Sequence, residues 1–195
     1  MKREDGLPRN PRIRYRFRAK PFDFMFQWMI GSSTTGGAEI GEAMYAASRI
    51  PDGDGEAWYR EFAELGARVA ERADASAAAG HRVSAREAWL RAYVYYRAAP
   101  LFLNPRTDQR YRAAYETARV LFRKGAELLD PPLEPIAIPY RSAELPGYIA
   151  SPTDGSEPRR APTLLMIGGG DTFVEDLYYY IVPPAKPTRI SGRLC

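Results

Sequence analysis

The stretch Pro162-Thr163-Leu164-Leu165-Met166-Ile167-Gly168-Gly169-Gly170-Asp171 decides the fold of this chain. Its apolar part, residues 164–167, predicts a short strand that is buried on both faces, as in the centre of a parallel sheet. The glycines predict a tight turn directly after the strand, and residues 173–182 predict the beginning of a helix. A strand, a glycine turn and a helix in this order present backbone N–H groups to an anion.

The position of this stretch in the chain also matters, because only 25 residues follow Gly170. Residues 183–195 contain three prolines and show no strand pattern, so they predict an irregular tail. We therefore expect a chain that stops before its sheet is complete. The strand at 164–167 would then stay poorly covered, which lowers stability and favours self-association, for example as a homodimer.

The composition is that of an ordinary globular protein, with 45% hydrophobic and 27% charged residues among 195. Its single cysteine, Cys195, allows no disulfide within the chain and gives no sign of an oxidising compartment. The N-terminus shows no secretory signal, and no apolar stretch is long enough to span a membrane. These features predict a cytoplasmic protein with no membrane partner.

The net charge of +4 is concentrated in an N-terminal arm. Residues 1–20 hold eight basic and two acidic residues, which leaves −2 for the rest, so the body offers nucleic acid no basic surface. Basic and apolar residues alternate in the arm, which predicts an extended segment that lays Ile13, Tyr15 and Phe17 on the body. The alternative is stacking on single-stranded nucleic acid, and the acidic body disfavours it.

Three helices are predicted between residues 56 and 131. The first spans residues 56–79, the second opens with a capping box at Ser84-Ala85-Arg86-Glu87, and the third begins near Asp108 and ends before Pro131. We expect the helices to pack through apolar side chains at helical spacing. These side chains are Trp58, Phe62, Leu65, Val69, Trp89, Tyr93, Tyr96, Tyr111, Tyr115, Phe122 and Leu129.

Strand patterns replace helical ones after Leu133. Residues 134–140 and 147–150 predict two short strands joined by a turn. Helices followed by such strands indicate the α/β class, with a helical domain that precedes an incomplete sheet. The predicted organisation is a basic arm at 1–20, a helical domain at 21–132, the start of an α/β core at 133–182 and the irregular tail at 183–195.

Several familiar motifs are excluded by single positions. A dinucleotide fingerprint would need a third glycine where Phe173 stands, and no lysine follows the glycines as a P-loop requires. A calcium loop after residue 52 would need glycine at Ala57 and an acid at Ala63. The only histidine, His81, lies in a predicted turn and favours a surface or capping role. We therefore expect no metal, no cofactor and, because no G-x-S-x-G occurs, no catalytic residue in this chain.

Five aromatic side chains in the helical domain allow two interpretations. At helical spacing most of them are expected in the core, yet a buried tyrosine hydroxyl needs a partner, so some of them are expected to line a substrate pocket. These residues are Trp58, Tyr59, Trp89, Tyr93 and Tyr96.

The order of several segments resembles one family over about residues 21–182. These segments are Gly36-Gly37-Ala38-Glu39-Ile40-Gly41-Glu42, Trp58, Ala88-Trp89, Tyr95-Tyr96-Arg97 and residues 163–171. Together they resemble the α/β hydrolases with an N-terminal helical cap, typified by 2,6-dihydroxypseudooxynicotine hydrolase and related to the FrsA-like proteins.

The resemblance implies that the helical domain is a cap over an active site. It implies that Gly168, Gly169, Gly170 and Asp171 supply half of an oxyanion hole through a backbone N–H. Such enzymes hydrolyse carbon–carbon bonds next to ketones, or esters and amides, in small-molecule substrates, with a Ser-Asp-His triad.

That triad is missing from this sequence, so we expect the chain to be inactive by itself. The alternative from another functional class is an all-helical, tetratricopeptide-like interaction module. No repeat period among Trp58, Trp89 and Tyr111 supports it.

Overall fold

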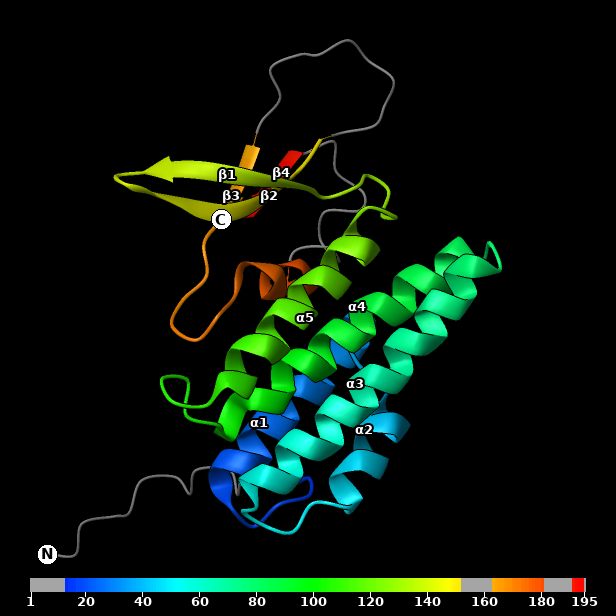
Figure 1. Ribbon diagram of the computed structural model, residues 1–195, viewed down its shortest axis with the longest axis vertical. Helices are drawn as coiled ribbons and strands as arrows, with labels where there is room; N and C mark the ends of the chain where they lie inside the picture. Colours follow the sequence, from blue (N-terminus) through cyan, green and yellow to red (C-terminus); the bar gives the residue numbers. More distant parts are fainter. Residues whose placement is uncertain (1–12, 152–162, 181–190, 195) are drawn as a thin grey trace, which may run out of the picture.

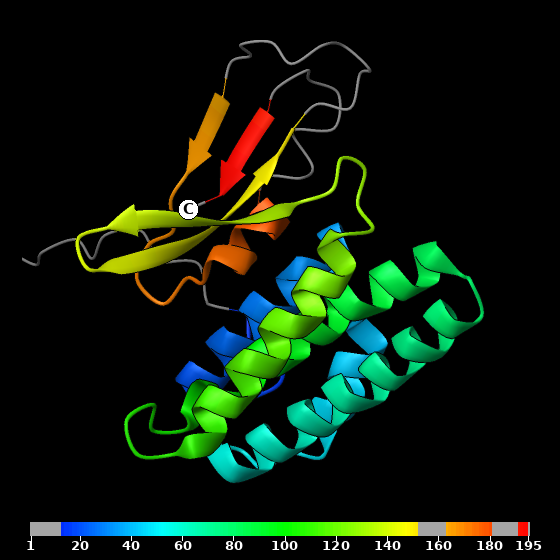
Figure 2. The same ribbon diagram turned by 45° about the horizontal axis from the view of Figure 1, so that its top comes forward.

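The computed structural model describes residues 13–151, 163–180 and 191–194. Helices come first along the chain, and a four-stranded sheet lies at one end of the helical bundle (Figures 1 and 2). The helical part consists of α1 (Lys20–Gly31), η1 (Ser32–Thr35), α2 (Ile40–Ser48), α3 (Gly55–Ala78), α4 (Arg82–Ala98), η2 (Ala99–Phe102) and α5 (Gln109–Ala126). The remaining elements are β1 (Glu134–Tyr140), β2 (Ala143–Ala150), β3 (Thr163–Met166), η3 (Val174–Leu177) and β4 (Ser191–Leu194).

Acidic caps fix the beginnings of α3 and α5, in agreement with the predicted helices. The Asp54 carboxylate accepts a hydrogen bond from Ala57 N at 2.9 Å, and Asp108 accepts one from Arg110 N at 3.0 Å. The predicted start of α4 is wrong, because the helix begins at Arg82 and the capping box lies inside it. The turn after α3 is so short that α4 begins two residues before Ser84.

The sequence patterns missed α1 and α2. Aromatic side chains and glycines hide the helical spacing of this region, and α2 uses a glutamate as its cap, since Glu39 accepts from Glu42 N at 2.7 Å. None of the helices in the described ranges combines the length and the apolar character needed to cross a membrane.

The helices pack around an aromatic core, as the stripes predicted. Trp58 lies at its centre, with its ring 4.7 Å from that of Phe62 and 5.4 Å from that of Phe22 between centroids. Burying each of these large side chains contributes about 1.5–3 kcal/mol. Five of the six large aromatic residues expected at the helix contacts are buried, namely Trp58, Phe62, Trp89, Tyr93 and Phe122. The sixth, Tyr115, is half-buried.

Phe17 is the side chain that the core fully buries among the described residues of the arm. Phe17 is 1% exposed and packs on Phe22 and Trp58, whereas Ile13 is 74% and Tyr15 52% exposed. The expectation that all three lie on the body is therefore wrong for Ile13 and Tyr15. The buried Asp23 carboxylate instead holds this segment by its backbone, since it accepts from the N–H groups of residues 15–17.

The sheet has the strand order β1-β2-β4-β3. β1 and β2 form an antiparallel hairpin, β2 pairs antiparallel with β4, and β4 pairs parallel with β3. The predicted irregular tail is thus wrong at Ser191–Leu194, where a four-residue strand enters the middle of the sheet. The rest of that tail, 183–190 and 195, lies outside the described residues.

β3 lies at the edge of this sheet, with β4 as its only partner among the described strands. The expectation of a central strand covered on both faces is not met, because Leu164 is 47% and Leu165 56% exposed. The expectation that this strand stays poorly covered agrees with these values. A mixed sheet after the helices also excludes the all-helical interaction module.

Candidate functional site

The glycine turn follows β3 at its carboxyl end. Asp171 adopts a φ of 61°, in the left-handed region that side-chain-bearing residues rarely enter. Thr172 N donates to Gly169 O at 3.3 Å and closes the turn. A side chain placed on Gly169 or Gly170 would meet nothing within 4 Å, so open space adjoins both glycines.

The turn carries two backbone N–H donors, those of Gly169 and Gly170. Within the described ranges, neither Gly169 nor Gly170 donates its N–H to a protein acceptor. Two such donors beside open space at the end of a strand can donate hydrogen bonds to an anion and stabilise its negative charge, including the charge of a developing oxyanion. The structure thus brings the predicted residues 168–171 together as one turn.

Arg97 of α4 reaches this turn from the helical bundle. The residue is buried, and its Nη2 donates to the carbonyl oxygen of Asp171. Its Nε donates to Asp176 Oδ2 at 3.2 Å, which makes a buried ion pair. The guanidinium also lies 4.0 Å from the centroid of the Phe173 ring, within the range of a cation–π contact.

Asp176 is the second member of this cluster. Its Oδ1 accepts the hydroxyl hydrogen of Tyr93 at 2.6 Å, and its Oδ2 accepts from Phe173 N at 3.0 Å. Burial, with a further contribution from the Asp176 carboxylate, raises the pKa of Tyr93 well above its ordinary value. Tyr93 therefore remains a protonated donor at physiological pH.

Glu175 places a second carboxylate beside the first and is fully buried. Its Oε1 accepts from the hydroxyl of Tyr148 at 3.1 Å and lies 3.5 Å from Nε of Arg119. Its Oε2 has no hydrogen-bond partner among the described residues. The segment 173–180 thus lies between sheet and helices, where Figures 1 and 2 show it in orange.

Sequence reasoning missed these supporting residues. Arg97 appeared only as part of a family resemblance, and Glu175 and Asp176 were not singled out. The available signal was two adjacent acids inside an otherwise apolar segment, since buried carboxylates require cationic partners. Their partners lie far away in the sequence, so no local pattern names them.

The five candidate pocket residues separate into core and surface positions. Trp58 is fully buried, and its Nε1 donates to the Ala98 carbonyl at 2.9 Å. Tyr93 is fully buried on Asp176. Tyr59 and Tyr96 are half-buried, and the Arg110 guanidinium lies 4.8 Å from the centroid of the Tyr59 ring.

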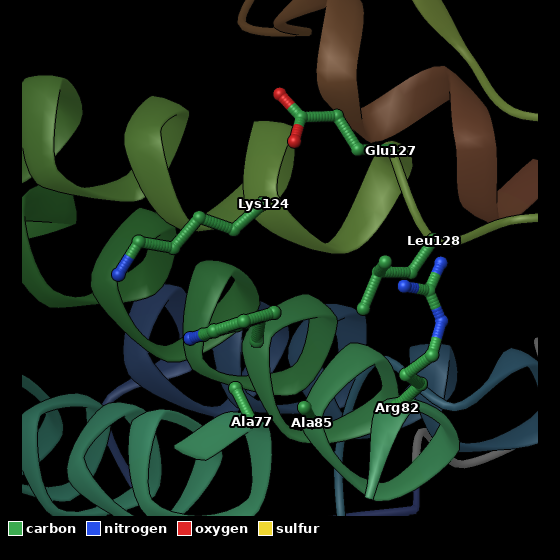
Figure 3. A pocket seen from close by; sticks show the side chains of 7 residues that line it. Ala77, Arg82, Ala85, Lys124, Glu127 and Leu128 are labelled. Atoms are coloured by element: carbon green, nitrogen blue, oxygen red, sulfur yellow. The ribbon is translucent and has the colours of Figure 1, made fainter. Parts of the chain in front are cut away.

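Trp89 is the member of this set that lines a cavity of about 250 Å³. Figure 3 shows this cavity with the side chains around it. The cavity lies where the ends of α3 and α5 meet the beginning of α4. Its lining residues are Ala77, Arg82, Ala85, Trp89, Lys124, Glu127 and Leu128. Oδ1 of Asp74 accepts hydrogen bonds from Nε1 of Trp89 and from Nζ of Lys124, each over 2.9 Å. No residue of the glycine turn lines this cavity, so it is separate from the turn.

A metal site requires several ligands in one place. Among the residues that the structure describes, no three His, Cys, Asp or Glu side chains gather in that way.

Sequence comparison finds several curated relatives with hydrolase names. The chain is 38% identical over 169 residues to Alpha/beta hydrolase psoB of Aspergillus fumigatus, covering 84% of this chain and 38% of that protein. It is 36% identical over 179 residues to Hydrolase acrC of Aspergillus aculeatus, covering 85% and 42%. It is 36% identical over 174 residues to 20-hydroxy-prefusarin hydrolase FUS2 of Gibberella moniliformis, covering 88% and 42%. No family model matches the chain.

Comparison with solved structures shows the same fold. The crystal structure of 2,6-dihydroxy-pseudo-oxynicotine hydrolase aligns with a TM-score of 0.68 at 19% identity, covering 88% of this chain and 44% of that one. The chain spans about two fifths of the length of the curated relatives that it matches. By sequence it is a homologue of curated α/β hydrolases over about two fifths of their length, and by fold it matches a solved hydrolase, with a helical domain before the sheet.

Proposed function

We propose that this chain provides the helical cap and the oxyanion turn of an α/β hydrolase that acts on a small carbonyl compound. The observation that carries the proposal is the turn at residues 168–171. It follows β3, leaves the N–H groups of Gly169 and Gly170 beside open space, and is held by Arg97. Donors fixed in this way stabilise the negative charge that develops on a carbonyl oxygen during hydrolysis.

The proposed division of labour follows the element order. Residues 21–132 would form the cap and residues 133–182 the start of the catalytic core, after a basic arm at 1–20. The helices end with α5 at Ala126 and the strands begin at Glu134, which supports a boundary near residue 132. Trp89 at the cavity and the half-buried Tyr59 and Tyr96 are the aromatic residues best placed to contact a ligand of the cap.

The names of the relatives support the reaction class. One similar structure is a hydrolase of 2,6-dihydroxy-pseudo-oxynicotine, and one relative is a 20-hydroxy-prefusarin hydrolase. We propose hydrolysis of a carbon–carbon bond next to a ketone, of an ester or of an amide. In each case a nucleophile attacks a carbonyl carbon and the carbonyl oxygen takes up charge, so the same turn would serve all three.

The chain would stabilise the charge on the carbonyl oxygen, but it would not supply the nucleophile that attacks the carbonyl carbon. Its sequence has no G-x-S-x-G elbow, and its only histidine, His81, lies between α3 and α4. His81 and Arg97 lie at opposite ends of α4, so this histidine is not placed to activate a serine at the turn. We propose that the 195-residue chain alone is inactive.

An ester assay tests the proposed inactivity. The purified chain and its His81→Ala variant are incubated with p-nitrophenyl acetate, beside a relative that carries a complete triad. We expect both samples to release nitrophenol at the rate of buffer, while the relative turns over. Turnover by the chain that disappears in His81→Ala would contradict the proposal.

A further inference from the structure

One arginine links the helical bundle to the backbone of the glycine turn. Arg97 lies in the last turn of α4, and the residues it contacts lie 74 and 79 positions away in the sequence. Its ion pair with Asp176 is buried on both sides, with each side chain 5% exposed. Buried ion pairs add little net stability, because desolvation offsets the attraction, so a role in fixing one conformation is the better account of this pair.

Arg97 and its partner Asp176 bind the backbone at Asp171 and just after it. Its Nη2 holds the carbonyl of Asp171, the residue with the left-handed φ of 61°. Its partner Asp176 accepts the backbone N–H of Phe173 at 3.0 Å. The backbone is thus fixed at a carbonyl and at an N–H only two residues apart, directly after the two glycines whose N–H groups have no acceptor among the described residues.

We propose that Arg97 is a positioning residue for the oxyanion turn. By holding Asp171 and, through Asp176, Phe173, it keeps the backbone of residues 168–171 in the one path that presents the N–H donors of Gly169 and Gly170. This inference rests on the proposed function of that turn. It also gives the helical cap a second role, because α4 would determine the geometry of the reaction centre as well as covering it.

The chemistry of the contact requires arginine rather than lysine. A planar guanidinium donates to two acceptors in fixed directions while its face stacks on an aromatic ring. Arg97 uses Nε for Asp176, Nη2 for Asp171 and its face for Phe173. A lysine ammonium would keep the charge opposite Asp176, but it would lose the fixed geometry and the stacking.

Backbone hydrogen exchange measured by NMR tests the proposal without any catalytic activity. The reporters are the hydrogen-bonded amides of Thr172 and Phe173, and amides in the middle of α3 report global opening. The variants are Arg97→Lys and the double variant Arg97→Met/Asp176→Asn, which removes the pair without leaving a buried charge alone. Arg110→Met is the matched control, because Arg110 pairs with Glu56 and Asp108 at the surface.

We expect the double variant to exchange at Thr172 and Phe173 roughly 10- to 100-fold faster than the wild type, while α3 amides stay unchanged. The exchange rates of Arg97→Lys at these amides should fall between those of the wild type and the double variant, and the rates of Arg110→Met should match the wild type. Wild-type exchange at the turn in the folded double variant would overturn the proposal. Equal acceleration at α3 would show that the pair is merely structural, and wild-type rates in Arg97→Lys would overturn the need for a guanidinium. The ester assay bears on the proposed function alone, so the two can fail separately.

Discussion

Tyr148 of β2 donates its hydroxyl hydrogen to Glu175 Oε1 over 3.1 Å, a contact that fastens the sheet to η3 inside the core. The ring of Phe122 in α5 packs on the same tyrosine, with centroids 5.2 Å apart. One side chain of the sheet therefore meets both the helical bundle and the segment that follows the glycine turn. This contact and that of Arg97 with Asp171 both connect the region around the glycine turn to neighbouring elements of the core.

Removing the Tyr148 hydroxyl should destabilise the protein. In Tyr148→Phe the buried Glu175 loses its hydrogen-bond donor, so the free energy of unfolding should fall by about 1–3 kcal/mol. Urea denaturation followed by circular dichroism measures the change. Tyr140→Phe, at an exposed position of β1, is the control and should stay within about 0.5 kcal/mol of the wild type. An unchanged midpoint for Tyr148→Phe would mean that this contact does not hold the sheet in place.

Asp23 should make stability depend on acid pH. Burial by itself would raise the pKa of its carboxyl, but hydrogen bonds from the backbone of residues 15–17 and from Gln27 outweigh burial and lower it. A carboxyl whose pKa is lower in the folded state stabilises the fold above its unfolded pKa of about 4. That stabilisation is lost as the pH falls through the folded-state pKa.

We expect Asp23→Asn to lower the free energy of unfolding by about 1.5–3 kcal/mol at pH 7. The gap between variant and wild type should shrink as the pH falls below about 4, because the unfolded wild-type chain then takes up a proton first and the folded carboxyl follows at its lower pKa. Urea titrations of both proteins at pH 7, 4 and 2.5 measure this gap. A gap of the same size at every pH would show that the charge of Asp23 has no part in holding the arm.

Gly37 should not tolerate a side chain. A Cβ there would lie 2.7 Å from Ser32 Oγ and 2.8 Å from Cε1 of Tyr179, both too close for real contacts. We expect Gly37→Ala to lower the free energy of unfolding by about 1–3 kcal/mol. Gly31→Ala is the matched control, because nothing lies within 4 Å of its Cβ and alanine favours the end of α1. Equal midpoints for the two variants would contradict the close packing of Tyr179 on this loop.

The edge strand β3 should drive self-association. Leu164 and Leu165 are about half exposed and Ile167 is 71% exposed, beside backbone groups that can pair with another chain. We expect the wild-type chain to form dimers or larger species at high concentration, and Leu165→Lys to shift it toward monomer. Sedimentation velocity over a range of concentrations measures the change. A wild-type chain that stays monomeric throughout would rule out association through this edge.

Local sequence patterns were sufficient to predict the helices and strands whose buried side chains recur with one regular spacing. α3 and β1 were predicted to within one residue of their observed bounds, and the start of α5 was predicted equally well, because one apolar stripe or one alternation covers each of them. The predicted end of α5, directly before Pro131, is wrong, because the helix ends at Ala126. β4 escaped prediction because Ser191–Leu194 is short, contains a glycine and becomes a strand only by pairing with β2 and β3. Tertiary pairing, rather than propensity, determines such a strand.

Only part of the candidate site could be predicted from the sequence, for the same reason. The glycine turn at residues 168–171 is a local feature, and the sequence placed it correctly after a strand. Its support by Arg97 and Asp176 joins residues far apart in the chain, so it depends on how α4 packs beside η3. The aromatic residues show the limit of periodicity, because helical spacing does not distinguish the buried Trp58 from the cavity-lining Trp89.

The catalytic competence of a chimera tests the central claim most directly. A relative is first chosen by its measured turnover of p-nitrophenyl acetate, with psoB as one candidate. Residues 13–180 of this chain then replace the matched part of that relative, and kcat is compared with that of the parent. If this chain carries a cap and an oxyanion turn, the folded chimera should keep kcat within about tenfold of the parent, since losing one oxyanion donor alone costs about 10²–10³. A folded chimera whose rate equals that of buffer would contradict the account.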